Sequence, residues 1–126
     1  MVATILVIDD DMPLVKMIKT SLEGEGYNVL TGFDGQMAVN LALTRKPHLI
    51  IMDVNMPMTN GLKALEFLRK TPATAHIPVI FLSGEKSGSI YPVIESSQRV
   101  AFIKKPLDIE HLLSLVRQYL QQYQSA

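Results

Sequence analysis

Short runs of consecutive apolar residues alternate along this chain with segments in which apolar residues recur at every third or fourth position. The runs are rich in isoleucine, valine and leucine, which is typical of strands buried on both faces of a sheet. The periodic segments are typical of helices with one apolar side. This pattern predicts strands over residues 4–8, 27–31, 49–53, 77–82 and 100–103, and helices over residues 13–24, 35–45, 61–70 and about 108–123.

Turn-forming residues separate the predicted elements. Pro13 suits the first turn of a helix that Asp10 or Asp11 can cap, and Gly24 ends that helix. A further helix is expected between the fourth and fifth strands, but Pro92 restricts it to a short segment or to one that begins near this proline. Strands that alternate with helices predict an α/β fold, in which a five-stranded parallel sheet has helices on both faces.

Composition narrows the class of protein. The 126 residues are the size of one domain, the 12 basic and 12 acidic residues cancel, and there is no cysteine. Balanced charge argues against direct nucleic-acid binding, which needs a basic excess, and the lack of cysteine excludes disulfides and thiolate-bound metals. No apolar run approaches the length of a membrane span, and the first residues lack the basic segment of a signal peptide. We therefore expect a cytoplasmic domain without membrane association.

Polar residues follow four of the five predicted strands. Asp9 and Asp10 come directly after the first strand, and Asp53 ends the third. Ser83 follows the fourth strand, and Lys105 lies two residues beyond the fifth. Because the carboxyl ends of parallel strands share one edge of the sheet, where ligands commonly bind, we expect these side chains to lie close together.

These residue types suit phosphoryl transfer. Clustered carboxylates repel one another unless a proton or a cation joins them, and oxygen ligands without Cys or His favour magnesium, manganese or calcium. A carboxylate such as Asp53 can act as a nucleophile and form an aspartyl phosphate. The metal and Lys105 would neutralise the charge that develops on the transferring group, and Ser83 could donate a hydrogen bond to a phosphoryl oxygen.

Each of these residues also has an ordinary explanation when it is taken alone. The aspartates after the first strand could be helix caps only, Asp53 and Ser83 could be loop residues, and Lys105 could be one of a solvated lysine pair. Their joint occurrence at the ends of different strands favours one site.

The same residues carry a resemblance to a known family. The chain resembles the receiver domain of two-component response regulators over nearly its whole length, and its spacing near the end resembles that of CheY-like members. The motifs concerned are Ile8-Asp9-Asp10, Met52-Asp53-Val54-Asn55-Met56-Pro57, Gly61, Leu82-Ser83 and Lys105-Pro106. The resemblance implies that residues 1–126 form a single receiver domain with a doubly wound, flavodoxin-like sheet of strand order 2-1-3-4-5.

The resemblance also implies a role for each site residue. Asp53 would accept a phosphoryl group from a sensor histidine kinase or a histidine phosphotransfer protein. Mg²⁺ would be bound by the side chains of Asp10 and Asp53 and by the main-chain carbonyl of Asn55, with Asp9 acting mainly through water. Lys105 would pair with Asp53 or with its phosphoryl group, and its peptide bond to Pro106 is expected to be cis.

A conformational switch is implied as well. Ser83 would move toward the phosphoryl group and Phe102 would turn inward, which changes the surface of the fourth helix, fifth strand and fifth helix. That surface would control a downstream effector protein or a fused output domain. Asn55 and Glu85 occupy positions that tune the phosphoryl lifetime, and we predict relatively brisk self-dephosphorylation. The domain is thus expected to be a phosphoacceptor rather than an enzyme, although it supports its own phosphotransfer and autodephosphorylation.

Two departures from the family pattern concern the surface that would contact the effector. Ser96-Ser97-Gln98-Arg99 stands where many members have a turn of small residues before the fifth strand. Phe102 replaces the commoner tyrosine, so the switch would depend on packing without a hydroxyl.

Three other functions would use some of the same residues. A haloacid-dehalogenase-type phosphohydrolase would place its nucleophile on the first strand with a second acid two residues later, whereas Asn55 occupies that second position here. A flavodoxin-like cofactor carrier would not place three aspartates where a phosphate binds. A receiver-like scaffold that no longer takes phosphate would not need the acid pair, Ser83 and Lys105. The chain could be a monomer or weak dimer, and a stand-alone regulator or part of a longer protein.

Overall fold

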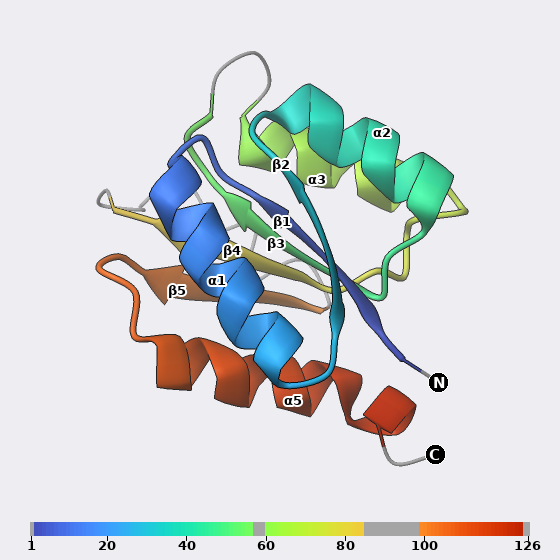
Figure 1. The fold of residues 1–126 in the computed structure, drawn as a ribbon. Coiled ribbons are helices and arrows are strands. Elements are labelled where there is room, and N and C mark those ends of the chain that lie inside the picture. The colour runs from blue at the N-terminus through green and yellow to red at the C-terminus, as the bar shows by residue number, and fades with distance from the viewer. Residues whose placement is uncertain (1, 57–59, 85–98, 125–126) are drawn as a thin grey trace.

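The computed structural model describes residues 2–56, 60–84 and 99–124 of the chain. Five strands form one parallel sheet in the order β2-β1-β3-β4-β5, which confirms the predicted fold class and strand order (Figure 1). The strands are β1 (Thr4–Ile8), β2 (Asn28–Gly32), β3 (Leu49–Asp53), β4 (Val79–Ser83) and β5 (Val100–Lys104). The second strand begins one residue later than predicted, and the fourth begins after Pro78, which has no amide hydrogen to donate to a neighbouring strand.

Four described helices connect and cover the strands. They are α1 (Met12–Gly24), α2 (Gly35–Arg45), α3 (Gly61–Lys70) and α5 (Ile109–Gln124). The helix expected between β4 and β5 lies outside the described residues. Of the two predicted caps for α1, Asp11 is the one whose side chain accepts a hydrogen bond from the Leu14 amide, at 3.1 Å. None of the described helices is long and apolar enough to cross a membrane.

The helices form a layer on each side of the sheet. Helices α1 and α5 cover one face, while α2 and α3 cover the other (Figure 1). Each face has its own apolar core, so every residue of the central strand β3 is buried. This double coverage explains why the strands appear in the sequence as continuous apolar runs rather than as alternating ones.

Backbone hydrogen bonds continue past the carboxyl ends of the strands. The Asp9 amide donates to the Gly32 carbonyl at 3.2 Å, the Val54 amide to Leu82 at 3.0 Å, and the Lys105 amide to Ser83 at 2.7 Å. The loops that leave β1, β3 and β5 are thereby tied to the neighbouring strands. The residues at this edge of the sheet are consequently held by the backbone as well as by their side chains.

Candidate functional site

Three carboxylates meet at the carboxyl edge of the sheet. Asp9 follows β1 directly, Asp10 comes next, and Asp53 is the last residue of β3. One oxygen from each lies within 4.8 Å of the others. Asp9 is fully buried and Asp53 is 6% exposed, whereas Asp10 faces solvent. The predicted acid cluster is therefore formed, with two members inside the protein and one at its surface.

Lys105 is the cation of this cluster. Its Nζ lies 3.0 Å from Asp9 Oδ2 and 3.7 Å from Asp53 Oδ2. Partial burial opposes the charge of the lysine, but the close contact with Asp9 and the attraction of Asp53 outweigh it and raise the pKa of Lys105. The ammonium is thus shared between two carboxylates and is closer to Asp9. The peptide bond from Lys105 to Pro106 is cis, as the resemblance implied.

The environment of Asp53 makes this carboxyl easier to protonate than an ordinary aspartate. Burial and the neighbouring charge of Asp9 raise its pKa from 3.8 to about 6, with a smaller contribution from Asp10. Lys105 and the backbone amide of Asn55 act in the opposite direction and do not cancel this effect. The Asn55 amide is 3.4 Å from Asp53 Oδ1, so this hydrogen bond is long. The positive charge of Lys105 is therefore not enough to offset burial and the negative charge of Asp9.

The donor set fits a divalent cation. Asp9 Oδ2 is buried and lacks a well-aligned hydrogen bond among the described residues, although the Lys105 ammonium lies within ion-pair distance. The other oxygen, Oδ1, accepts from the Asp11 amide at 2.9 Å, which fixes the orientation of the carboxylate. Hard oxygen donors without sulfur or imidazole suit Mg²⁺. Asp9, Asp10 and Asp53 are consequently the residues that could hold the metal.

Gly61 determines how the loop after Asp53 closes. The Gly61 amide donates to the Val54 carbonyl at 2.8 Å, so the start of α3 lies against the end of β3. A Cβ atom at this position would lie 2.6 Å from the Asp53 carbonyl oxygen and 3.0 Å from Phe81 Cε1. Only glycine fits without a shift of the backbone. Sequence reasoning noted Gly61 as part of a motif but gave it no role, because this close approach depends on packing.

The structure describes three of the four remaining predicted residues. Ser83 ends β4 and is buried, at the same edge as Asp53. Phe102 lies on β5, is half-buried and is paired in register with Phe81. Asn55 is exposed two residues beyond Asp53. Glu85, a predicted tuning residue, lies outside the described residues.

One surface hollow lies beside the acid cluster. Its volume is about 520 Å³, and it is lined by Asp10, Met12, Phe33 and Asp34. Met12 and Phe33 are each about half exposed, 52% and 51%. Sequence reasoning missed this apolar pair, because the two residues are far apart in the chain and neither belongs to a motif.

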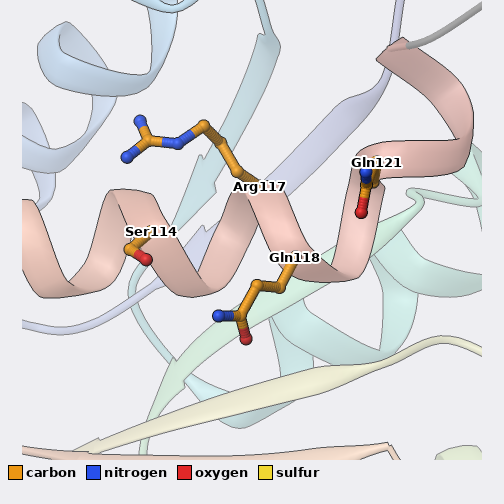
Figure 2. A pocket seen from close by; sticks show the side chains of 4 residues that line it. All are labelled: Ser114, Arg117, Gln118 and Gln121. Carbon is orange, nitrogen blue, oxygen red and sulfur yellow. The ribbon is translucent and has the colours of Figure 1, made fainter.

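A further hollow, about 340 Å³, lies on α5 and is lined by Ser114, Arg117, Gln118 and Gln121. Figure 2 shows Arg117 and Gln118 extending to opposite sides of the helix. Arg117 is paired with Glu25 at 2.8 Å. These lining residues include no carboxylate, so the chemistry expected of the chain is not located there.

Comparison with known proteins agrees with this geometry. Residues 5–117 match the family model of the response regulator receiver domain. The regulator RpaA of Synechocystis, a DNA-binding dual master transcriptional regulator, is 35% identical over 118 residues, which are 92% of this chain and 48% of RpaA. The polar-differentiation response regulator DivK of Brucella anthropi is 26% identical, over 93% of this chain and 95% of DivK.

The chain thus spans about half of RpaA but nearly all of DivK. Solved structures show the same fold. The chemotaxis response regulator CheY4 of Vibrio cholerae has a TM-score of 0.85 at 28% identity, and the match covers 95% of this chain and 100% of CheY4. The receiver domain of the Francisella response regulator 1452 has a TM-score of 0.83 at 31% identity, covering 97% and 99% of the two chains. This chain belongs to the receiver domain family of two-component response regulators.

Proposed function

We propose that residues 1–126 form a single receiver domain that acts as a phosphorylation-dependent switch, with Asp53 as the phosphoacceptor. The position of Asp53 carries this proposal. It ends the central strand, lies 3.7 Å from the Lys105 ammonium, and has two further carboxylates within 4.8 Å. The family membership implies phosphoryl acceptance on an aspartate, and the geometry favours Asp53 because it combines burial, a cation and neighbouring acids.

Different residues of the site would have different roles in phosphoryl transfer. An oxygen of ionised Asp53 forms a bond to phosphorus while the P–N bond of a phosphohistidine breaks, and the imidazole keeps the electron pair. The Lys105 ammonium is close enough to follow the negative charge onto the phosphoryl oxygens. Asp11 and the backbone bonds at the sheet edge hold Asp9 and Lys105 in place, so little rearrangement is needed at the moment of transfer.

Receiver domains bind Mg²⁺ at their acidic pocket, and Asp9, Asp10 and Asp53 would hold it here, together with the main-chain carbonyl of Asn55. When bound, Mg²⁺ would neutralise carboxylate and phosphoryl oxygens. A cation held by these residues would favour the ionised form of Asp53, and this carboxylate is the nucleophile.

Phosphorylation would be communicated through Ser83 and Phe102. Ser83 is buried at the end of β4, beside the β5 edge strand that carries Phe102. A hydrogen bond from Ser83 to the new phosphoryl group would draw the end of β4 inward and let Phe102 turn inward. The surface formed by the fourth helix, β5 and α5 would change as a result and control an effector protein or a fused output domain.

The phosphoryl lifetime would be set by Asn55 and Glu85. Asn55 is exposed beside Asp53, where its side chain can meet an attacking water. We propose relatively brisk self-dephosphorylation on this basis, supported by the domain itself rather than by a separate enzyme.

The hollow beside the acid cluster suggests how the donor approaches. Met12 and Phe33 expose apolar surface in a hollow that Asp10 and Asp34 also line. A sensor histidine kinase or histidine phosphotransfer protein would dock there through an apolar side chain that has basic neighbours. We propose a cytoplasmic domain, monomeric or weakly dimeric, that does not bind nucleic acid directly.

Intact mass after incubation with acetyl phosphate and Mg²⁺ tests the proposal. Wild type should gain one phosphoryl group, whereas Asp53→Asn and wild type in EDTA should gain none. If wild type shows no adduct, beryllofluoride separates fast hydrolysis from lack of reaction, because it forms a stable mimic of the phosphoryl group on an active receiver. A folded protein that responds to neither reagent would instead be a receiver-like scaffold.

A further inference from the structure

Two arginines lie close together at the amino-terminal ends of β4 and β5, whereas Asp53 lies at the carboxyl end of its strand. Arg69 lies in the last turn of α3, and Arg99 directly precedes β5. Arg69 donates from Nη1 to the Ile77 carbonyl at 2.7 Å and from Nη2 toward the Arg99 carbonyl at 3.4 Å. Arg99 donates from Nη1 to the His76 carbonyl at 2.9 Å. Because the two guanidinium groups bind carbonyls of adjacent residues, they lie near each other.

This pair of positive charges has no carboxylate within ion-pair distance in the described parts of the chain. Arg117, by contrast, is paired with Glu25 at 2.8 Å. Partial burial lowers the pKa of Arg69, and the nearby charge of Arg99 lowers it further. Two like charges are therefore held together by backbone carbonyls, which satisfy some of their hydrogen-bond donors but do not cancel the charge.

The backbone of Arg99 is also unusual. Its φ angle of 62° is in the left-handed region, which costs a residue other than glycine free energy. The side chain of Arg99 donates to the His76 carbonyl, a bond that needs a donor but not a positive charge, and no described carboxylate pairs with it.

We propose that Arg69 and Arg99 form a binding site for a phosphate group. Two guanidinium groups match the charge of a phosphate dianion, and each guanidinium has donors left over after its bonds to carbonyls. Arginine suits this task because its planar fork can bind two oxygens at once. Tyr119 on α5 is half-buried near Arg69 and adds a hydroxyl at the margin of the site. The phosphate group would be either the free ion or an ester.

The site would be independent of the phosphoacceptor. It lies where β4 and β5 begin, whereas Ser83 and Lys105 lie where these strands end, and Figure 1 shows the two edges at opposite ends of the strands. Asp53→Asn should therefore leave phosphate binding at the arginines unchanged. A protein that fails to be phosphorylated on Asp53 could therefore still bind phosphate at the arginines, so the two proposals can fail separately.

Amide NMR spectra of the full chain in EDTA provide the test. Inorganic phosphate and glycerol phosphate are titrated separately at constant ionic strength, because added salt alone screens surface charge. Saturable shifts are expected at His76, Ile77, Arg99 and Tyr119, with affinity in roughly the millimolar range. Tighter binding of one probe identifies the free ion or the ester as the natural form.

Three variants make the outcome decisive. Arg99→Gln should weaken binding by roughly tenfold or more, and Arg99→Lys should retain part of it, because lysine keeps the charge but loses the fork. Arg117→Gln, which removes an arginine already paired with Glu25, should bind phosphate as wild type does. No saturable shifts, or shifts of equal size in Arg99→Gln, would overturn the proposal. Circular dichroism of each variant confirms that it is folded.

Discussion

Replacing Asp53 by asparagine should stabilise the metal-free protein at neutral and alkaline pH. In the folded chain, burial and the charge of Asp9 raise the pKa of Asp53 to about 6, whereas its ordinary value is 3.8. A carboxyl group with a raised pKa in the folded state contributes stability that is fully present below about pH 4 and is lost as the pH rises through 6. Asparagine cannot ionise, so the variant avoids this loss.

The size of the effect follows from the shift. A rise from 3.8 to about 6 corresponds to roughly 3 kcal/mol at pH 8, and nearly nothing below pH 4. Asp53 is 6% exposed, but the neighbouring Asp10 faces solvent, so water screens part of the interaction. We therefore expect Asp53→Asn to gain about 1–2 kcal/mol over wild type between pH 4.5 and pH 8.

Urea unfolding followed by circular dichroism measures this difference. Wild type and variant are compared in EDTA at several pH values, so that the titration of all other groups cancels between them. Addition of Mg²⁺ should then stabilise wild type more than the variant, because the metal binds the folded, ionised site. The gap between the two proteins should narrow accordingly.

A matched control removes an acid elsewhere. Glu66 lies on the exposed side of α3, where it pairs with Lys70 at 3.2 Å, and Glu66→Gln should change stability by less than about 0.5 kcal/mol at every pH. The reasoning is refuted if the gain from Asp53→Asn is the same at pH 4.5 and pH 8, or if Asp53→Asn destabilises the protein at pH 8.

Three further predictions concern the same site. Below pH 6 the apparent affinity for Mg²⁺ should fall by roughly tenfold per pH unit, because protons compete for Asp53; calorimetric titration that finds constant affinity down to pH 5 would contradict this. Lys105→Met should slow phosphorylation by acetyl phosphate by about two orders of magnitude, as measured by a phosphorylation time course. It should also destabilise the fold, as measured by urea unfolding, because the buried charge of Asp9 loses its partner. Gly61→Ala should lower the free energy of unfolding by about 1–3 kcal/mol. Gly24→Ala is the control and should be neutral or stabilising, because a Cβ there meets nothing within 4 Å. Equal effects of the two changes in urea unfolding would show that the backbone around Gly61 can move apart at no cost in stability.

The sheet could be predicted because its strands are buried on both sides. In β3, all five residues are buried, and no helix-like period interrupts the run from Leu49 to Met52. The strand boundaries moved by one or two residues where the deciding factor was hydrogen bonding, as at Pro78, rather than hydrophobicity. Element type was thus determined by local pattern, while the ends depended on neighbouring strands that a single segment does not reveal.

The acid cluster was predictable for a similar reason. Parallel strands bring their carboxyl ends together whatever the details of packing, so Asp9, Asp53 and Lys105 had to meet. The preference of Lys105 for Asp9 over Asp53 could not be foreseen, because it depends on distances of 3.0 and 3.7 Å. The arginine pair at the other edge was not predicted either, since Arg69 and Arg99 come together through carbonyls of a connection without a motif.

Negative charge exceeds positive charge at the site until a cation binds. Asp9, Asp10 and Asp53 bring three negative charges when ionised, and Lys105 is the one ammonium that contacts them in the described structure. Burial and the charge of Asp9 both favour protonation of Asp53, as its raised pKa expresses, and a bound proton removes one of these negative charges. Without the proton, one divalent cation would balance the two negative charges that exceed the charge of Lys105 and so leave Asp53 nucleophilic. The instability of the metal-free site and its readiness to react with a phosphoryl donor therefore have the same electrostatic origin.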